Sequence, residues 1–115
     1  MKTKIVVNLE IEGLHRWPDA NSKIPKVGYL SDSHRHIFKI ECKKIVNDND
    51  RQVEFIMFKR EILKYLEKKY YDKKYEMSNF GRMSCEDIAT ELMLKYDLNY
   101  CRVMEDGENG AEVEK

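Results

Sequence analysis

Two of the three histidines in this 115-residue chain stand two residues apart in the stretch DSHRHIFKIE, residues 32–41. Along a β-strand, residues i and i+2 point the same way with Cβ atoms about 7 Å apart, so His34 and His36 are able to share one metal ion. The plainer interpretation is two polar side chains on a solvated strand face. The remaining histidine, His15, follows the first predicted strand and comes near the pair if the two strands are neighbours. Three neutral imidazoles leave one tetrahedral position open, which is typical of catalytic zinc.

The bulk composition is that of one folded domain, with 42% hydrophobic and 37% charged residues. Because 21 basic residues balance 21 acidic ones, no overall field attracts nucleic acid or an anionic membrane. No apolar run approaches the roughly 20 residues of a membrane span, and the N-terminus alternates too early for a signal peptide. The three cysteines are odd in number and widely spaced, so we expect reduced thiols in a cytoplasmic protein.

Hydrophobic periodicity divides the chain into strands and helices. The predicted strands cover residues 4–11, 34–46, 51–57 and 98–105, with a short acidic strand after the last of these. The NDND turn at residues 47–50 is expected to close a hairpin. Helical spacing predicts helices over residues 59–70 and 84–96, the second opened by a capping motif at Ser84 and Asp87. Residues 12–33 and 71–83 are interpreted as irregular connections. The fold class that we predict is α+β, a four-stranded antiparallel sheet with two helices on one face.

Five stretches, in order along the chain, resemble the 6-pyruvoyltetrahydropterin synthases and the bacterial 6-carboxytetrahydropterin synthases of the 7-deazaguanine (queuosine) pathway. EGLHRW supplies His15 after the first strand, and SHRHIF supplies His34 and His36 of the family's HGH motif. VEFIMFKREI, with Glu54, resembles the Asp-Phe pair before the first helix, and MSCEDIA resembles the Pro-Thr-x-Glu-Asn-x-Ala helix start. CRVMEDGENGAEVE places Glu105 at the late glutamate that grips the pterin ring in the family.

This resemblance implies the tunnelling fold, in which oligomerisation into trimers or hexamers completes a barrel and places the sites at subunit interfaces. It implies Zn²⁺ on His15, His34 and His36, and a lyase-type reaction in the family. It also implies a pterin- or purine-like ligand bound by Glu54 and Glu105, with Glu105 approaching from a neighbouring chain.

Two departures from the family concern proton transfer. Leu30 stands where the family has its catalytic cysteine, and Lys73, after Asp72, stands where it has the partner histidine. A leucine cannot accept a proton, and a lysine does so only if its pKa falls toward about 7–8. Asp72, Lys73 and Asp32 are therefore the candidate acid/base residues. Their plainer interpretations are a surface ion pair for the first two and a turn cap for Asp32.

Three functional hypotheses follow from these residues. The first is a zinc-dependent enzyme acting on a pterin or a related purine-derived heterocycle, with Glu105 holding the ring. The second is a non-catalytic zinc-containing protein that binds such a pterin- or nucleotide-like ligand. The third is a structural or interaction oligomer in which the histidines bind nothing. For Glu105 alone, the plainer interpretation is that the acidic tail from Glu105 to Glu114 only keeps the chain terminus solvated.

Overall fold

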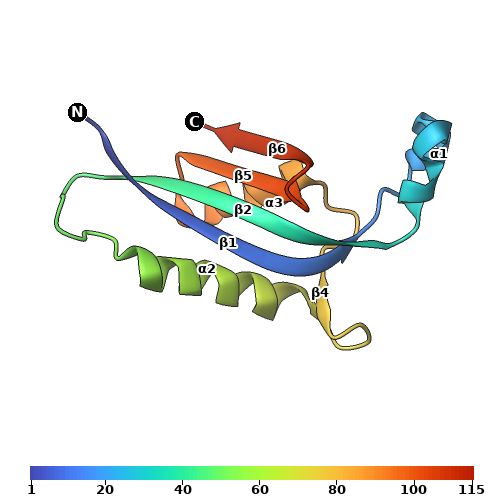
Figure 1. Cartoon of the computed structure of the whole chain (residues 1–115), viewed down its shortest axis with the longest axis horizontal. Helices are drawn as coiled ribbons and strands as arrows, with labels where there is room; N and C mark the ends of the chain where they lie inside the picture. Colours follow the sequence, from blue (N-terminus) through green and yellow to red (C-terminus); the bar gives the residue numbers. More distant parts are fainter.

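Two long alternating segments form the centre of the molecule, which we describe from a computed structural model of residues 1–115. Strands β1 (Thr3–His15) and β2 (His34–Val46) lie side by side and pair antiparallel along their whole length (Figure 1). Thr3 lies opposite Val46 and His15 lies opposite His34. The connection between them contains the short helix α1 (Ala20–Lys23) and the 3-10 helix η1 (Pro25–Ser31). The bounds of β2 are those that the sequence predicts, whereas β1 is longer than predicted at both ends.

The sheet has six strands in the order β3-β4-β1-β2-β5-β6. The additional strands are β3 (Tyr71–Asp72), β4 (Met77–Asn79), β5 (Tyr100–Glu105) and β6 (Asn109–Glu114). β4 runs parallel to β1 and all other neighbours are antiparallel, so the sheet is mixed. The prediction of a four-stranded antiparallel sheet is therefore wrong. Strands β3 and β4 are too short, at two and three residues, to show the alternation that identifies a strand.

Helix α2 (Phe55–Tyr70) begins four residues earlier than predicted because Glu54 caps it. The Glu54 carboxylate accepts hydrogen bonds from the backbone N–H groups of Ile56 and Met57, two of the donors that a helix start leaves unpaired. The predicted strand over residues 51–57 and its hairpin are therefore wrong. Helix α3 (Cys85–Tyr96) confirms the predicted capping motif, with Ser84 and Asp87 bonded to each other's backbone N–H groups.

Both helices contribute to one hydrophobic core on a single face of the sheet, as predicted. The sheet residues of this core come from alternate positions of neighbouring strands: Val7, Leu9, Ile11, Phe38, Ile40, Cys42, Cys101 and Val103. The helices add Phe58, Ile62, Leu66, Ile88, Ala89, Leu92 and Met93. Because side chains alternate along a strand, this face continues beyond Ile11 to His15 and beyond Phe38 to His36 and His34. None of the helices is both long and apolar enough to cross a membrane.

Candidate metal centre

The three histidines meet where β1 ends and β2 begins. The pairing of Gly13 with His36 and of His15 with His34 puts all three rings on the core side of the sheet. The ring centroid of His15 lies 4.6 Å from that of His34 and 5.3 Å from that of His36. One ligand nitrogen from each residue lies within 4.8 Å of the other two, so the cluster is able to hold a metal ion. The predicted proximity of residue 15 to residues 34 and 36 is confirmed.

A hydrogen bond at Nδ1 sets the tautomer of each ring. His15 Nδ1–H donates to the Met83 carbonyl oxygen at 2.9 Å, and His34 Nδ1–H donates to the Asp32 carbonyl oxygen at 2.8 Å. His36 Nδ1–H donates to Oδ2 of Asp106 at 2.7 Å. Carbonyl and carboxylate oxygens only accept, so each neutral ring keeps its proton on Nδ1 and presents a lone pair at Nε2. Metal-ligating histidines are oriented by partners of this kind.

The Glu105 carboxylate faces the Nε2 side of the cluster. Its Oε2 lies 2.9 Å from Nε2 of His15 and its Oε1 lies 3.6 Å from Nε2 of His36. These approaches lie outside hydrogen-bond geometry, and both Nε2 atoms are buried without a hydrogen-bond partner. Burial acts to lower the pKa of His15, but Glu105 and the Met83 carbonyl outweigh it and raise this pKa. The contact with His15 in turn lowers the pKa of Glu105.

Glu105 belongs to the same chain as the histidines that it faces. The resemblance implied an approach from a neighbouring chain, whereas the contact described here forms within one chain. β5 pairs with β2 so that Glu105 lies opposite Phe38, two positions along β2 from His36, and its side chain shares the face of the histidines.

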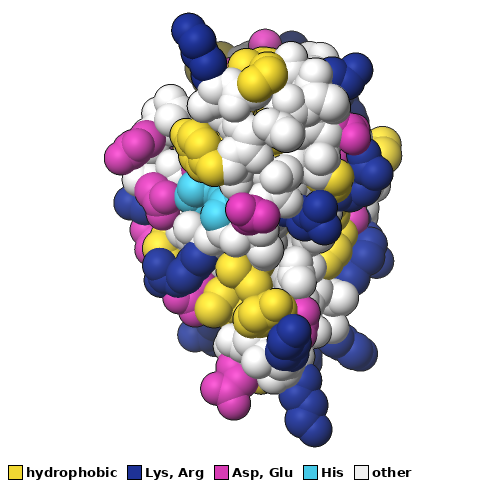
Figure 2. Space-filling model, turned by 90° about the vertical axis from the view of Figure 1, so that its right-hand side faces the viewer, with side chains coloured by type: hydrophobic (Ala, Val, Ile, Leu, Met, Phe, Trp, Pro, Cys, Tyr) yellow, Lys and Arg dark blue, Asp and Glu magenta, His cyan; other side chains and the backbone are white.

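A cavity of about 420 Å³ opens beside His15, His34 and Glu105. Leu30 lines it, in the position for which the resemblance implied a cysteine, and so does Trp17. Figure 2 shows part of the histidine cluster at the surface, with acidic side chains beside it. The cluster is therefore accessible from outside although His15 itself is only 7% exposed.

Two residues at the site escaped sequence reasoning. Asp106 accepts the hydrogen bond from Nδ1 of His36 through its Oδ2, and its Oδ1 accepts a hydrogen bond from the backbone N–H of Ile37 at 2.8 Å. Cys85, the first residue of α3, lines the cavity, and its Sγ–H donates to Oε2 of Glu105 at 3.7 Å. Burial, followed by the Glu105 charge, raises the pKa of the Cys85 thiol to about 12, so the thiol stays protonated. The only sequence signal for Asp106 is its place directly after Glu105, and Cys85 has none beyond its place in the capping motif.

The other predicted site residues lie elsewhere in the chain or act through the backbone. Asp32 contributes its carbonyl oxygen to His34. The Asp72 carboxylate accepts hydrogen bonds from Asn79 and from the backbone of Lys74, which lowers its pKa, with the Asn79 bond as the largest cause. Asp72 and the exposed Lys73 line a separate hollow. Glu54 caps α2 in a hollow with Thr3, at the opposite end of β1 from His15. Within one chain, the side chains of Asp72, Lys73 and Glu54 therefore do not lie beside the histidines.

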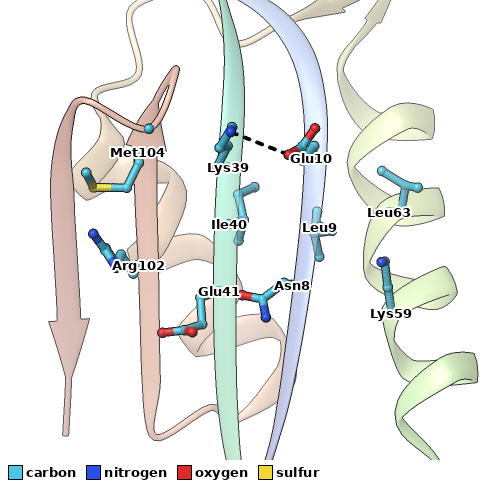
Figure 3. Close-up of a pocket in the computed structure, with 11 residues that line it drawn as sticks. Asn8, Leu9, Glu10, Lys39, Ile40, Glu41, Lys59, Leu63, Arg102 and Met104 are labelled. Atoms are coloured by element: carbon cyan, nitrogen blue, oxygen red, sulfur yellow. Dashed lines mark ion pairs between the residues drawn. The ribbon is translucent and has the colours of Figure 1, made fainter.

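The largest hollow, about 660 Å³, lies over the other face of the sheet and holds no histidine (Figure 3). Five of its 11 lining residues are charged, and two of these, Lys39 and Glu10, form an ion pair at 3.7 Å across β1 and β2. Side chains that neutralise one another are weaker candidates for a small-molecule site than unpartnered nitrogens that converge. The smaller histidine cavity is therefore the candidate functional site.

Comparison with models of known protein families and with curated proteins found no match. The function proposed for this chain therefore rests on its own residues and their geometry.

Proposed function

We propose that this chain binds one Zn²⁺ through Nε2 of His15, His34 and His36 and acts on a pterin- or purine-type heterocycle, as a lyase-like enzyme resembling the 6-pyruvoyl- and 6-carboxytetrahydropterin synthases. The observation that carries this proposal is the set of three Nδ1 hydrogen bonds, which leave Nε2 of each ring free to bind, in a cluster where one nitrogen of each ring lies within 4.8 Å of the other two. Imidazole donors with an open fourth position suit zinc better than the hard cations Mg²⁺ and Ca²⁺, which prefer oxygen.

The cavity matches a small planar ligand in size and in chemistry. Its volume of about 420 Å³ falls within the range of about 300–1,000 Å³ that is usual for ligand pockets. A carboxylate such as Glu105 accepts two parallel hydrogen bonds from the N–H and amino groups of a pterin or guanine edge. Trp17 offers a flat apolar side chain in the same cavity. Zinc, when bound, supplies Lewis-acid polarisation of oxygen atoms on the ligand.

A specific observation favours the second candidate, a non-catalytic binding protein. Leu30 lines the cavity where a proton-accepting thiolate would be needed, and Lys73 lies outside it. The remaining thiol, Cys85, is protonated and hydrogen-bonded to Glu105. Binding would survive these replacements because it needs only the three histidines and Glu105, which the chain retains.

Two experiments decide between the hypotheses. Metal analysis of protein purified without a histidine tag should find about one zinc per chain, and the H34A/H36A variant should lose it. Arg35→Ala is the matched control, because Arg35 lies between the two histidines and forms its ion pair with Glu12. Zinc-free wild-type protein with unchanged melting of H34A/H36A would rule out both zinc-based functions. Incubation with 7,8-dihydroneopterin triphosphate then separates turnover from binding alone.

We also infer that the sheet is closed by further copies of the chain. β1 has a partner on its outer side only at Gly13 and Leu14, and β6 has none on its outer side. A groove of about 510 Å³ runs between β1 and α2, with Lys59 and Arg60 in its wall, while β6 carries Glu112 and Glu114. Exposed strand edges are normally paired or covered, and the opposite charges favour β6 of a second copy as the occupant.

The three cysteines are free thiols, and we place the protein in the cytoplasm.

A further inference from the structure

Glu105 lies close to the distance from the histidines that a fourth metal ligand would have. On a tetrahedral zinc with bonds of about 2.0–2.2 Å, two ligand atoms are about 3.3–3.6 Å apart. The Glu105 oxygens lie 2.9 Å from Nε2 of His15 and 3.6 Å from Nε2 of His36. The second distance falls in this range and the first is shorter than it, so a shift of the Glu105 side chain by a few tenths of an ångström would bring the carboxylate to a metal held by the rings.

The electrostatics of this contact favour a positive charge between the carboxylate and the rings, supplied by a metal ion or by a proton on Nε2 of His15. Each neutral ring turns a lone pair toward Glu105 because its proton is held at Nδ1. A carboxylate oxygen 2.9 Å from a nitrogen lone pair is repelled by it. A proton on Nε2 would relieve the repulsion best along a straight hydrogen bond, but the observed approach is not aligned as one. A metal ion attracts the carboxylate and all three nitrogens together.

The surroundings hold Glu105 in this place and favour its negative charge on the metal. The Cys85 thiol donates to the same oxygen that faces His15. Zinc on three neutral imidazoles carries a net charge of +2 in a half-buried site, and no cysteine thiolate is present to reduce it. Coordination by one carboxylate halves that charge.

We propose that Glu105 is the fourth zinc ligand when no small molecule is bound, so that the resting site is closed. This inference rests on the zinc site proposed above. Glu105 cannot hold the metal and grip a heterocycle at the same time. A ligand entering the cavity must therefore release the carboxylate from the metal, which frees both oxygens to bind the ring edge.

The test compares wild-type protein with Glu105→Gln, after removal of metal and loading with Co²⁺ as a coloured substitute for zinc. In Glu105→Gln, water takes the vacated position, and metal-bound water loses a proton near neutral pH. We expect the visible spectrum of the variant to change between about pH 7 and 9 and the wild-type spectrum to stay constant. Zinc affinity, measured by chelator competition, should fall at least about tenfold in the variant.

Glu108→Gln is the matched control, because Glu108 is an exposed glutamate three residues further along the chain. It should leave both the spectrum and the affinity unchanged, and the melting curves of the metal-free forms show that each variant folds. If Glu105→Gln binds Co²⁺ with the wild-type spectrum and affinity, the proposal that Glu105 is a metal ligand is overturned, while the proposed three-histidine site stands. If neither protein binds metal, both proposals are overturned.

Discussion

At the scale of single residues, the chemistry of the site depends on what lies behind each imidazole. Two of the three Nδ1 partners are backbone carbonyls, of Met83 and Asp32, which substitution does not remove. The third is the Asp106 carboxylate, which is also bonded to the Ile37 N–H. This double attachment makes Asp106 the one side chain that orients a histidine of the cluster, and its charge would strengthen that ring as a ligand of the proposed zinc.

Asp106→Ala is expected to weaken zinc binding by about 10–100-fold, because the His36 ring loses the partner that fixes its orientation and tautomer. Chelator competition measures the effect, and Asp50→Ala, in the exposed turn after β2, is the control. Equal zinc affinity in wild type and Asp106→Ala would show that the carboxylate does not support the metal.

Gly13 lies between Ile11 and His15 on the face that carries the histidines, and it has room for no side chain. A Cβ at this position would lie 2.6 Å from Cε2 of Phe80, whose ring is 2% exposed. Overpacking a buried site typically costs about 1–3 kcal/mol. We expect Gly13→Ala to lower the free energy of unfolding by that amount in urea denaturation. Adding Phe80→Leu should recover part of the loss, and additive effects of the two substitutions would contradict the clash.

At the scale of elements, the two helices are joined by a polar cluster as well as by the core. Glu91 of α3 accepts hydrogen bonds from three α2 side chains: Tyr65 at 3.0 Å, Lys69 at 3.1 Å, and Tyr70. Tyr65 and Tyr70 therefore both pack against the core and bind a carboxylate. Burial acts to raise the pKa of Glu91, but the bonds from Tyr70, Lys69 and Tyr65 outweigh it and lower this pKa.

Glu91→Gln is expected to lower the free energy of unfolding at pH 7 by about 1–3 kcal/mol, because charge-assisted hydrogen bonds are lost. A carboxyl group whose pKa is lowered by folding stabilises the protein above its unfolded pKa of about 4.3, and this contribution disappears as pH falls through the folded value. The difference between wild type and variant should therefore shrink below about pH 4. Urea denaturation of wild type and variant at pH 7 and at about pH 3.5 measures this difference in the free energy of unfolding.

Glu67→Gln, at an exposed position of α2, is the control for this substitution. It should change stability by less than about 0.5 kcal/mol at either pH. A Glu91→Gln deficit that is the same at pH 7 and at pH 3.5 would mean that the carboxylate charge contributes nothing.

At the scale of the whole molecule, balanced total charge hides an uneven distribution. The groove wall on α2 is basic at Lys59 and Arg60, and the free strand β6 is acidic at Glu112 and Glu114. If these surfaces join successive copies, reversing the charges of either one should lower the oligomer mass seen by light scattering. A mixture of K59E/R60E and E112K/E114K should assemble again, because each variant then complements the other.

K73E/K74E, in the exposed turn between β3 and β4, is the matched control and should keep the wild-type mass. A monomeric wild-type chain would contradict closure by second copies. Failure of the mixed variants to assemble would show that these two surfaces are not the ones that meet.

The sequence by itself determined the features that depend on neighbours along the chain. The alternation of residues 34–46 predicted β2 and put His34 and His36 on one side of it, and the Ser84 capping motif predicted the start of α3. It did not predict β3 and β4, or the first turn of α2, because two- and three-residue strands and a glutamate cap leave little trace in hydrophobic periodicity.

Only the tertiary structure decided which distant residues meet. The β1–β2 register set His15 opposite His34, and the β2–β5 pairing turned Glu105 of the same chain toward the rings. The loop before α3 brought the Met83 carbonyl and Cys85 to the cavity. Hydrogen bonds between backbones set these relations, and backbone hydrogen-bonding groups are the same for almost every residue type. The spacing of residues along the sequence therefore could not show that the Glu105 carboxylate contacts His15 and His36 within one chain.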